Sequence, residues 1–132
     1  MTGLAPADTS EGPSFSLGHI IVTNRAQKAL EQFGLQPEMY LERHGQRDWG
    51  DVDADEANAN YEYFEEGRGP IVSTYRFHPK NWNVSLTVYT DGNRRLTAVA
   101  LTREAMKVGF LESMRRKAAN LEGARPFTSV ER

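Results

Sequence analysis

Residues 71–101 read IVSTYRFHPKNWNVSLTVYTDGNRRLTAVAL, and this stretch predicts most of a β-sheet. Apolar residues recur at every second position in 71–77 and 83–90, while 95–101 is apolar on both faces, and both patterns are typical of strands. Asp91-Gly92 favours a tight hairpin between the last two runs, because both residues tolerate the positive φ of a primed turn. HPKNW (78–82) allows a looser turn between the first two. The stretch therefore predicts an antiparallel meander.

Helical patterns precede these strands. Residues 25–34 (RAQKALEQFG) place apolar side chains on one face, with Asn24 expected as the N-cap and Gly34 as the residue that ends the helix. Residues 36–45 (QPEMYLERHG) predict a second short helix with a proline in its first turn. Leu17–Thr23 contains a β-branched run and is a candidate for an additional first strand.

Residues 103–123 predict one C-terminal helix capped by Thr102. Its apolar residues repeat every four positions, at Met106, Phe110, Met114 and Ala118. Such a stripe needs a surface to cover, and the sheet is the obvious one. The expected fold class is α+β, with N-terminal helices, a three- or four-stranded antiparallel sheet and a C-terminal helix packed on that sheet.

Composition indicates a soluble, single-domain protein. The 132 residues are 39% hydrophobic and 26% charged, with no cysteine and a net charge of −2. We expect a flexible arm at 1–15, one domain at 16–122 and a tail at 123–132. No signal peptide or membrane-spanning run is evident, so the expected location is the bacterial cytoplasm, without membrane contact.

His44–Gly67 (HGQRDWGDVDADEANANYEYFEEG) holds eight acidic residues between Asp48 and Glu66. The carboxylate spacing of a calcium-binding EF-hand is present at Asp51, Asp53, Asp55 and Glu62. Glu56, however, stands where the EF-hand loop needs glycine. We therefore expect neither a metal site of this type nor a cofactor.

A capped helix explains more of the acidic stretch. Asp53 and Glu56 have the spacing of a capping box, and Gly67 stands where the helix should end. The predicted buried face comprises Ala57, Tyr61 and Phe64. The predicted solvent-facing acids are Glu62, Glu65 and Glu66.

The sequence Asp48-Trp49-Gly50-Asp51 lies ahead of this helix and admits two interpretations. In one, Trp49 is a hydrophobic anchor that folds a tight turn onto the domain. In the other, Trp49 is an aromatic anchor for a bound protein, and Asp48 and Asp51 accept its hydrogen bonds.

Several segments together resemble a family of small proteins from bacterial plasmids, phages and other mobile elements. The pattern comprises RH at 43–44, DWGDVD at 48–53, AN at 59–60, IVSTYR at 71–76 and TDGNRRLTAVAL at 90–101. The resemblance implies a mobile-element accessory protein, but it supplies no reaction and no catalytic residue. The N-terminal arm and the C-terminal helix are additions to the family core.

Three functional classes remain in order of preference. The first is a non-catalytic protein that binds a host or competitor protein, as an inhibitor of bacterial defence of the anti-CRISPR or anti-restriction type; its candidate residues are Trp49, Asp48, Asp51, Glu62, Glu65 and Glu66. The second binds nucleic acid through Lys107, Arg115, Arg116 and Lys117. The third is a small carboxylate- or metal-dependent enzyme centred on His44, Asp48 and Asp51.

Overall fold

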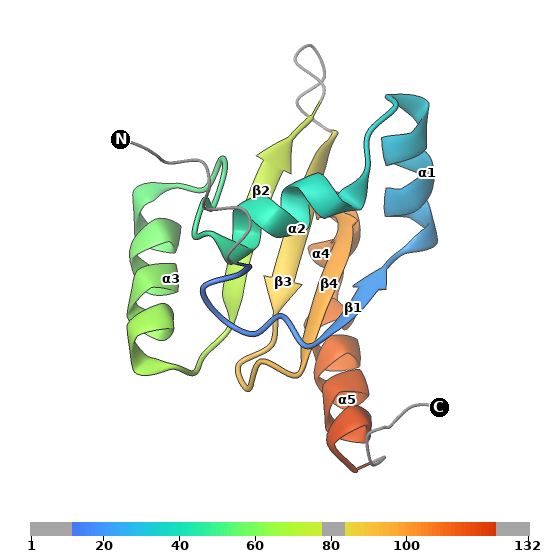
Figure 1. The fold of residues 1–132 in the computed structure, drawn as a ribbon. Helices are drawn as coiled ribbons and strands as arrows, with labels where there is room; N and C mark the ends of the chain where they lie inside the picture. Colours follow the sequence, from blue (N-terminus) through green and yellow to red (C-terminus); the bar gives the residue numbers. More distant parts are fainter. Residues whose placement is uncertain (1–11, 78–83, 124–132) are drawn as a thin grey trace.

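The computed structural model describes residues 12–77 and 84–123, apart from the side chains of 121–123 (Figure 1). The predicted turn at residues 78–82 and the tail from 124 onward lie outside the described residues. In chain order the elements are β1 (His19–Val22), α1 (Asn24–Gln32), α2 (Pro37–Gly45), α3 (Ala54–Glu66), β2 (Ile71–Arg76), β3 (Ser85–Thr90), β4 (Leu96–Leu101), α4 (Thr102–Ala105) and α5 (Phe110–Gly123).

The sheet has the strand order β1-β4-β3-β2. Strands β2, β3 and β4 form the predicted antiparallel meander, in which Ser73 lies opposite Val88 and Val88 opposite Val99. The fourth strand, β1, runs parallel to β4, so the expectation of a wholly antiparallel sheet is wrong for this pair. Three helices separate β1 from β2, and this long connection lets the chain cross the sheet instead of turning back in a hairpin.

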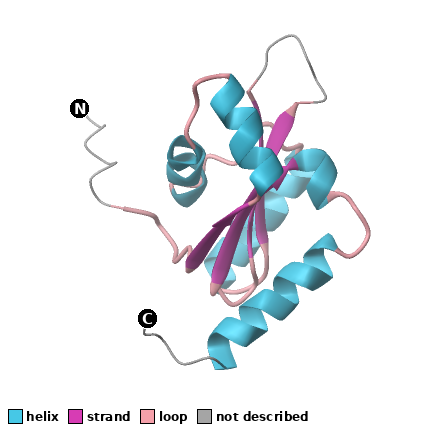
Figure 2. Ribbon diagram, turned by 90° about the vertical axis from the view of Figure 1, so that its right-hand side faces the viewer, coloured by secondary structure: helices cyan, strands magenta, loops and turns pink. Residues whose placement is uncertain are grey.

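Helices cover both faces of the sheet (Figure 2). Helices α1 and α2 contribute to one core cluster, which contains Leu30, Tyr40, Tyr75 and Val88. Helix α5 contributes Met114 and Ala118 to a second cluster with Tyr89, Leu96 and Ala98. Helix α3 lies beside the edge strand β2 (Figure 1). The predicted α+β class, with a C-terminal helix on the sheet, is confirmed.

The N-cap of α1 is Thr23, not the predicted Asn24. The Thr23 hydroxyl oxygen accepts a hydrogen bond from the Ala26 N–H at 3.1 Å and donates its proton to Glu104 Oε1 at 2.7 Å. The second bond joins positions 81 residues apart. Both residues are good caps by local propensity, so a contact that only the folded chain can make selects between them. Gly34, at φ 69°, follows the helix as expected.

The prediction of one continuous C-terminal helix is wrong. The chain leaves the helical path after Ala105 and resumes it at Phe110, past Gly109 with a φ of 93°. Leu101, not Thr102, is the N-cap of α4, and Glu104 accepts its backbone N–H at 2.9 Å. The break leaves Met106 79% exposed, whereas Phe110 is partly buried and Met114 and Ala118 are buried. None of the helices described here is both long and apolar enough to cross a bilayer.

Candidate functional site

Strand β2 is an edge strand, and an exposed edge normally presents unpaired backbone groups to other chains. The outward-facing groups at Val72 are instead bound by the side chain of Asn60 from α3. Asn60 Nδ2 donates to the Val72 carbonyl at 2.8 Å, and Asn60 Oδ1 accepts the Val72 N–H at 3.0 Å. One buried amide thus completes the ladder at this position.

The Asp48–Asp51 turn covers the same edge at Thr74 and at the Arg76 N–H. The Trp49 carbonyl accepts the Thr74 N–H at 3.1 Å, and the Asp51 N–H donates to the Thr74 carbonyl at 2.6 Å. Two residues further along the strand, Asp51 Oδ2 accepts the Arg76 N–H at 2.8 Å. We call residues 48–51 the acidic loop. This loop covers the edge of β2, and a second strand cannot add there without displacing it.

The turn itself is held by Asp48. Its carboxylate forms an ion pair with Arg43 at 2.7 Å and accepts the Gly50 N–H at 3.2 Å. The Arg43 guanidinium holds the pKa of Asp48 below its usual range, mainly through this hydrogen bond. The Tyr75 hydroxyl donates to the Asp48 carbonyl at 2.6 Å, so the turn is tied to the core as well as to the edge.

Trp49 is 5% exposed, and its ring centroid lies 5.5 Å from that of Tyr61 and 6.1 Å from that of His44. This placement agrees with the interpretation of Trp49 as a hydrophobic anchor. A bound protein could contact the indole only after a rearrangement of the turn. Among the described residues, the indole Nε1 has no hydrogen-bond acceptor.

Helix α3 begins and ends as predicted. Asp53 and Glu56 form the capping box, with the two reciprocal bonds at 2.8 and 3.0 Å, and Gly67 ends the helix at φ 76°. The predicted burial of Tyr61 is wrong, because this side chain is 46% exposed and Asn60 is 3% exposed. The hydrogen bonds to β2 turn position 60 toward the sheet and leave position 61 at the periphery.

His44 is fully buried at the centre of a chain of hydroxyl groups. Its Nδ1 lies 2.6 Å from Ser73 Oγ and its Nε2 lies 2.9 Å from Thr90 Oγ1. Thr90 Oγ1 lies 2.7 Å from Thr97 Oγ1, which donates to the Leu17 carbonyl at 2.7 Å. These contacts connect α2 with three strands and the segment before β1.

The donor and acceptor of each hydrogen bond in this series follow from its last acceptor, the Leu17 carbonyl. The Leu17 carbonyl can only accept, so Thr97 uses its proton there and must accept from Thr90. Thr90 then has no proton left for His44, and the imidazole must donate from Nε2. The remaining nitrogen, Nδ1, accepts from Ser73. His44 is thus the neutral Nε2–H tautomer, with all four hydroxyl and imidazole protons assigned.

The geometry of Ser73 and His44 is that of a nucleophile and its base, but the pair is not equipped for catalysis. Both side chains are 0% exposed. Burial, with a smaller contribution from the charge of Arg94, lowers the pKa of His44 to about 3. A base with this pKa takes up a proton poorly near neutral pH. The pair is therefore a structural element of the core.

Acidification should destabilise the protein through His44. Between its folded pKa of about 3 and its ordinary value of 6.5, only the unfolded chain binds the proton, so stability falls as pH decreases through this window. The slope should approach about 1.4 kcal/mol per pH unit. Urea unfolding at pH 7, 6 and 5 measures this slope of the unfolding free energy with pH. These pH values lie above the range in which most carboxylates titrate. His44→Leu should flatten the slope, and an equal slope in both proteins would contradict the assignment.

The last residues of the predicted flexible arm, 1–15, contact the domain. The Phe15 ring lies 5.4 Å from the His44 ring, edge to face, and the Ser14 N–H donates to the Gly45 carbonyl at 2.7 Å. These contacts cover the buried imidazole from the solvent side. The described part of the arm therefore belongs to the packed structure.

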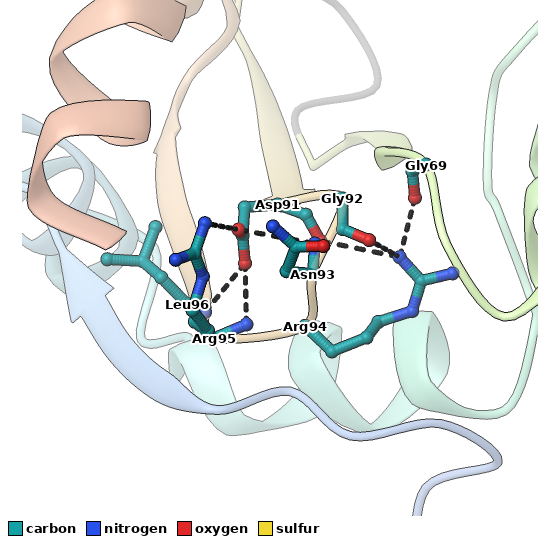
Figure 3. A network of polar contacts seen from close by, with 7 residues as sticks. All are labelled: Gly69, Asp91, Gly92, Asn93, Arg94, Arg95 and Leu96. Carbon is teal, nitrogen blue, oxygen red and sulfur yellow. Dashed lines mark hydrogen bonds and ion pairs between the residues drawn. The ribbon is translucent and has the colours of Figure 1, made fainter. Parts of the chain in front are cut away.

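A second polar network holds the turn between β3 and β4 (Figure 3). Asp91 is 2% exposed, and its Oδ1 accepts the backbone N–H groups of Arg95 at 2.6 Å and Leu96 at 3.0 Å. Arg94, at φ 62°, turns its guanidinium the other way and donates to the Gly69 carbonyl, which follows α3. The network fixes α3 against the sheet, so the charged groups of Asp91 and Arg94 have a structural role.

The structure does not bring His44, Asp48 and Asp51 into one site. His44 uses both nitrogens on hydroxyls, Asp48 pairs with Arg43, and Asp51 lies on the edge of β2. Within the described ranges, no group of three acidic or histidine residues is arranged to hold a metal ion. The geometry therefore does not favour an active site centred on these three residues.

The predicted basic candidates are exposed but do not form one patch on one element. Lys107 lies in the turn before α5, whereas Arg115, Arg116 and Lys117 lie within the helix. Arg115 forms an exposed ion pair with Glu112 at 2.8 Å. The charge available to phosphate is consequently smaller than the sequence suggests.

The predicted acidic face of α3 is exposed and carries no internal counter-charge. In the part of the chain that the structure describes, no ion pair involves Glu62, Glu65 or Glu66. An open hollow of about 390 Å³ lies on this face, lined by Asp55, Asn58, Ala59, Tyr61, Glu62 and Glu65. The hollow combines carboxylates with one half-exposed aromatic ring.

Comparisons with known proteins add no further constraint on the site. No family model matches the sequence, and neither the curated proteins nor the solved structures gave a significant match.

Proposed function

We propose that this protein is a non-catalytic binding protein whose α3 face docks onto a basic surface of a host or competitor protein. The observation that carries the proposal is the exposed, unpaired acidic face of α3. The other titratable candidates are engaged elsewhere: His44 lies in the core, and Asp48 and Asp51 hold the edge of β2. An unneutralised acidic face attracts basic partners over several ångströms and raises association rates.

The resemblance of the sequence to mobile-element proteins suggests which partner this face would meet. Proteins that cut or bind nucleic acid present basic surfaces, and a row of carboxylates can compete with phosphate for such a surface. The proposed role is therefore inhibition of bacterial defence, of the anti-CRISPR or anti-restriction type. Nucleic-acid binding through α5 is the second candidate, supported by the exposure of Arg116 and Lys117.

Neutralising the α3 face tests the proposal. Tagged protein is used to capture proteins from a bacterial lysate, with and without nuclease, and captured proteins are identified by mass spectrometry. For a stoichiometric partner that survives nuclease, the triple variant Glu62→Gln, Glu65→Gln, Glu66→Gln should bind at least about tenfold more weakly, mostly through a slower association rate. Wild-type affinity should also fall as salt is raised.

The matched control changes the same number of charges away from α3. Glu31→Gln, Glu38→Gln and Glu42→Gln lie on α1 and α2 and are exposed in the structure. This variant should bind as the wild type does. Equal binding by both triple variants, or capture that disappears with nuclease, would refute the proposal in its present form.

A further inference from the structure

The two edges of the sheet differ in how their backbone groups are used. At β2 the outward-facing N–H and C=O groups of Val72 and Thr74, and the N–H of Arg76, are bound by α3 or by the acidic loop. At β1 the N–H groups of His19 and Thr23 donate inward to β4, at 2.9 and 3.0 Å. Successive residues of a strand point their backbone groups to opposite sides, so Ile20 and Val22 point outward. Among the described residues, none binds these four outward groups.

The β1 edge also lacks most of the features that prevent strands from pairing. Its sequence is His-Ile-Ile-Val, without lysine, proline or acidic residues, and it contains no bulge. Ile20 is 44% exposed. Figure 1 shows β1 at the side of the sheet opposite α3. In the described part of the chain, the shortness of the strand is the main feature that limits what could add to this edge.

We propose that β1 pairs with β1 of a second copy of this chain. In the antiparallel arrangement a two-fold axis passes beside Ile21, and Ile20 of each copy lies opposite Val22 of the other. Residues 20 and 22 then exchange their N–H and C=O groups, so all four outward groups of each copy are bound. Ile21 meets its own counterpart in a non-hydrogen-bonded pair, where side chains approach most closely.

The chemistry of the edge favours a second copy over a different partner. The strand has no charged side chain that would select an acidic or basic peptide, but its aliphatic residues complement one another. On one face Ile20 covers Val22 of the second copy, and on the other the two Ile21 side chains meet. Because β1 contains no lysine, arginine or acidic residue, the antiparallel pairing places no like charges opposite one another.

The dimer would join two four-stranded sheets into one continuous sheet. Its ends would be the two covered β2 edges, so growth would stop at two copies. With seven strand spacings between them, the β2 strands would lie about 34 Å apart. Each copy would also present its α3 face at one end. This inference does not depend on the proposed function.

Sedimentation of the full chain from about 10 to 500 µM tests the association. Because the contact is small, we expect half-dimerisation at roughly 100 µM, with an average mass that rises from 14.9 kDa toward twice that value. Ile20→Pro removes one outward N–H and leaves the hydrogen bonds between β1 and β4 intact. Ile20→Lys adds a positive charge to each copy at the proposed contact. Both variants should remain monomeric. Met39→Lys, which alters a similarly exposed apolar residue on α2, should dimerise normally.

Cross-linking tests the register, because the natural chain has no cysteine. Ile21→Cys should form a disulfide-linked dimer at least about tenfold faster than Val108→Cys, since the two positions 21 would lie about 4.5 Å apart between Cα atoms. Random collision predicts the reverse order, because Val108 is fully exposed and Ile21 is not. A monomer at every concentration, or a dimer that persists in Ile20→Pro and Ile20→Lys, would overturn the proposal.

Discussion

Gly50→Ala should lower the free energy of unfolding by about 3 kcal/mol or more. Gly50 has a φ of 77°, which costs a residue with a Cβ atom about 1 kcal/mol or more. The larger penalty is steric. A Cβ at this position would lie 2.2 Å from the Thr74 carbonyl oxygen and 2.5 Å from the Tyr75 ring, neither of which can move without opening the edge of β2. Urea unfolding at pH 7 measures the loss.

Gly67→Ala is the matched control for this variant. Gly67 has a φ of 76°, but nothing lies within 4 Å of the position that its Cβ would occupy. The backbone cost is therefore the same and the steric cost is absent, so the loss should be about 1 kcal/mol. Equal losses at the two glycines would show that the acidic loop yields easily and does not hold the edge of β2.

His44→Leu should cost about 3 kcal/mol, although leucine has a similar volume. The substitution removes two buried hydrogen bonds and leaves the Ser73 proton without its acceptor. Most of the penalty comes from the orphaned hydroxyl, because a buried donor without a partner loses its hydration and gains nothing in return.

Adding Ser73→Ala to His44→Leu tests this explanation. The double variant should be more stable than His44→Leu alone by about 1 kcal/mol, because it removes the orphaned donor. His19→Leu, at an exposed histidine, should change stability by less than about 0.5 kcal/mol. A double variant that is less stable than either single variant would contradict the proton assignment, and simple packing would then explain the effect.

Some elements were predictable because a few adjacent residues determine them. The capping box of α3 joins positions three apart, and Gly67 ends the helix at a conformation that glycine adopts most easily. The meander follows from the period-two pattern, but the expected primed turn at Asp91-Gly92 is wrong, because residues 91–95 join β3 to β4 and the positive φ falls on Arg94. Each of these depends on interactions that the unfolded chain could already sample.

The parts that could not be predicted depend on contacts between distant segments. Asn60 offered one signal, since it is an amide within the apolar spacing of Ala57 and Phe64, but nothing local indicates that its partner is the backbone of β2. The hydrogen-bonded chain around His44 likewise joins residues up to 80 positions apart, and its histidine, serine and threonines look like ordinary polar residues in the sequence.

Local chemistry therefore determined the fold class, the capped α3 helix and its exposed acidic face, because short-range spacing and backbone preference are written in adjacent residues. Tertiary structure alone decided the cap of α1, the direction of β1 and the assignment of the Asp48–Asp51 turn to the edge of β2. In each case the choice depends on hydrogen bonds between segments that are distant in the sequence and meet only when the sheet is complete.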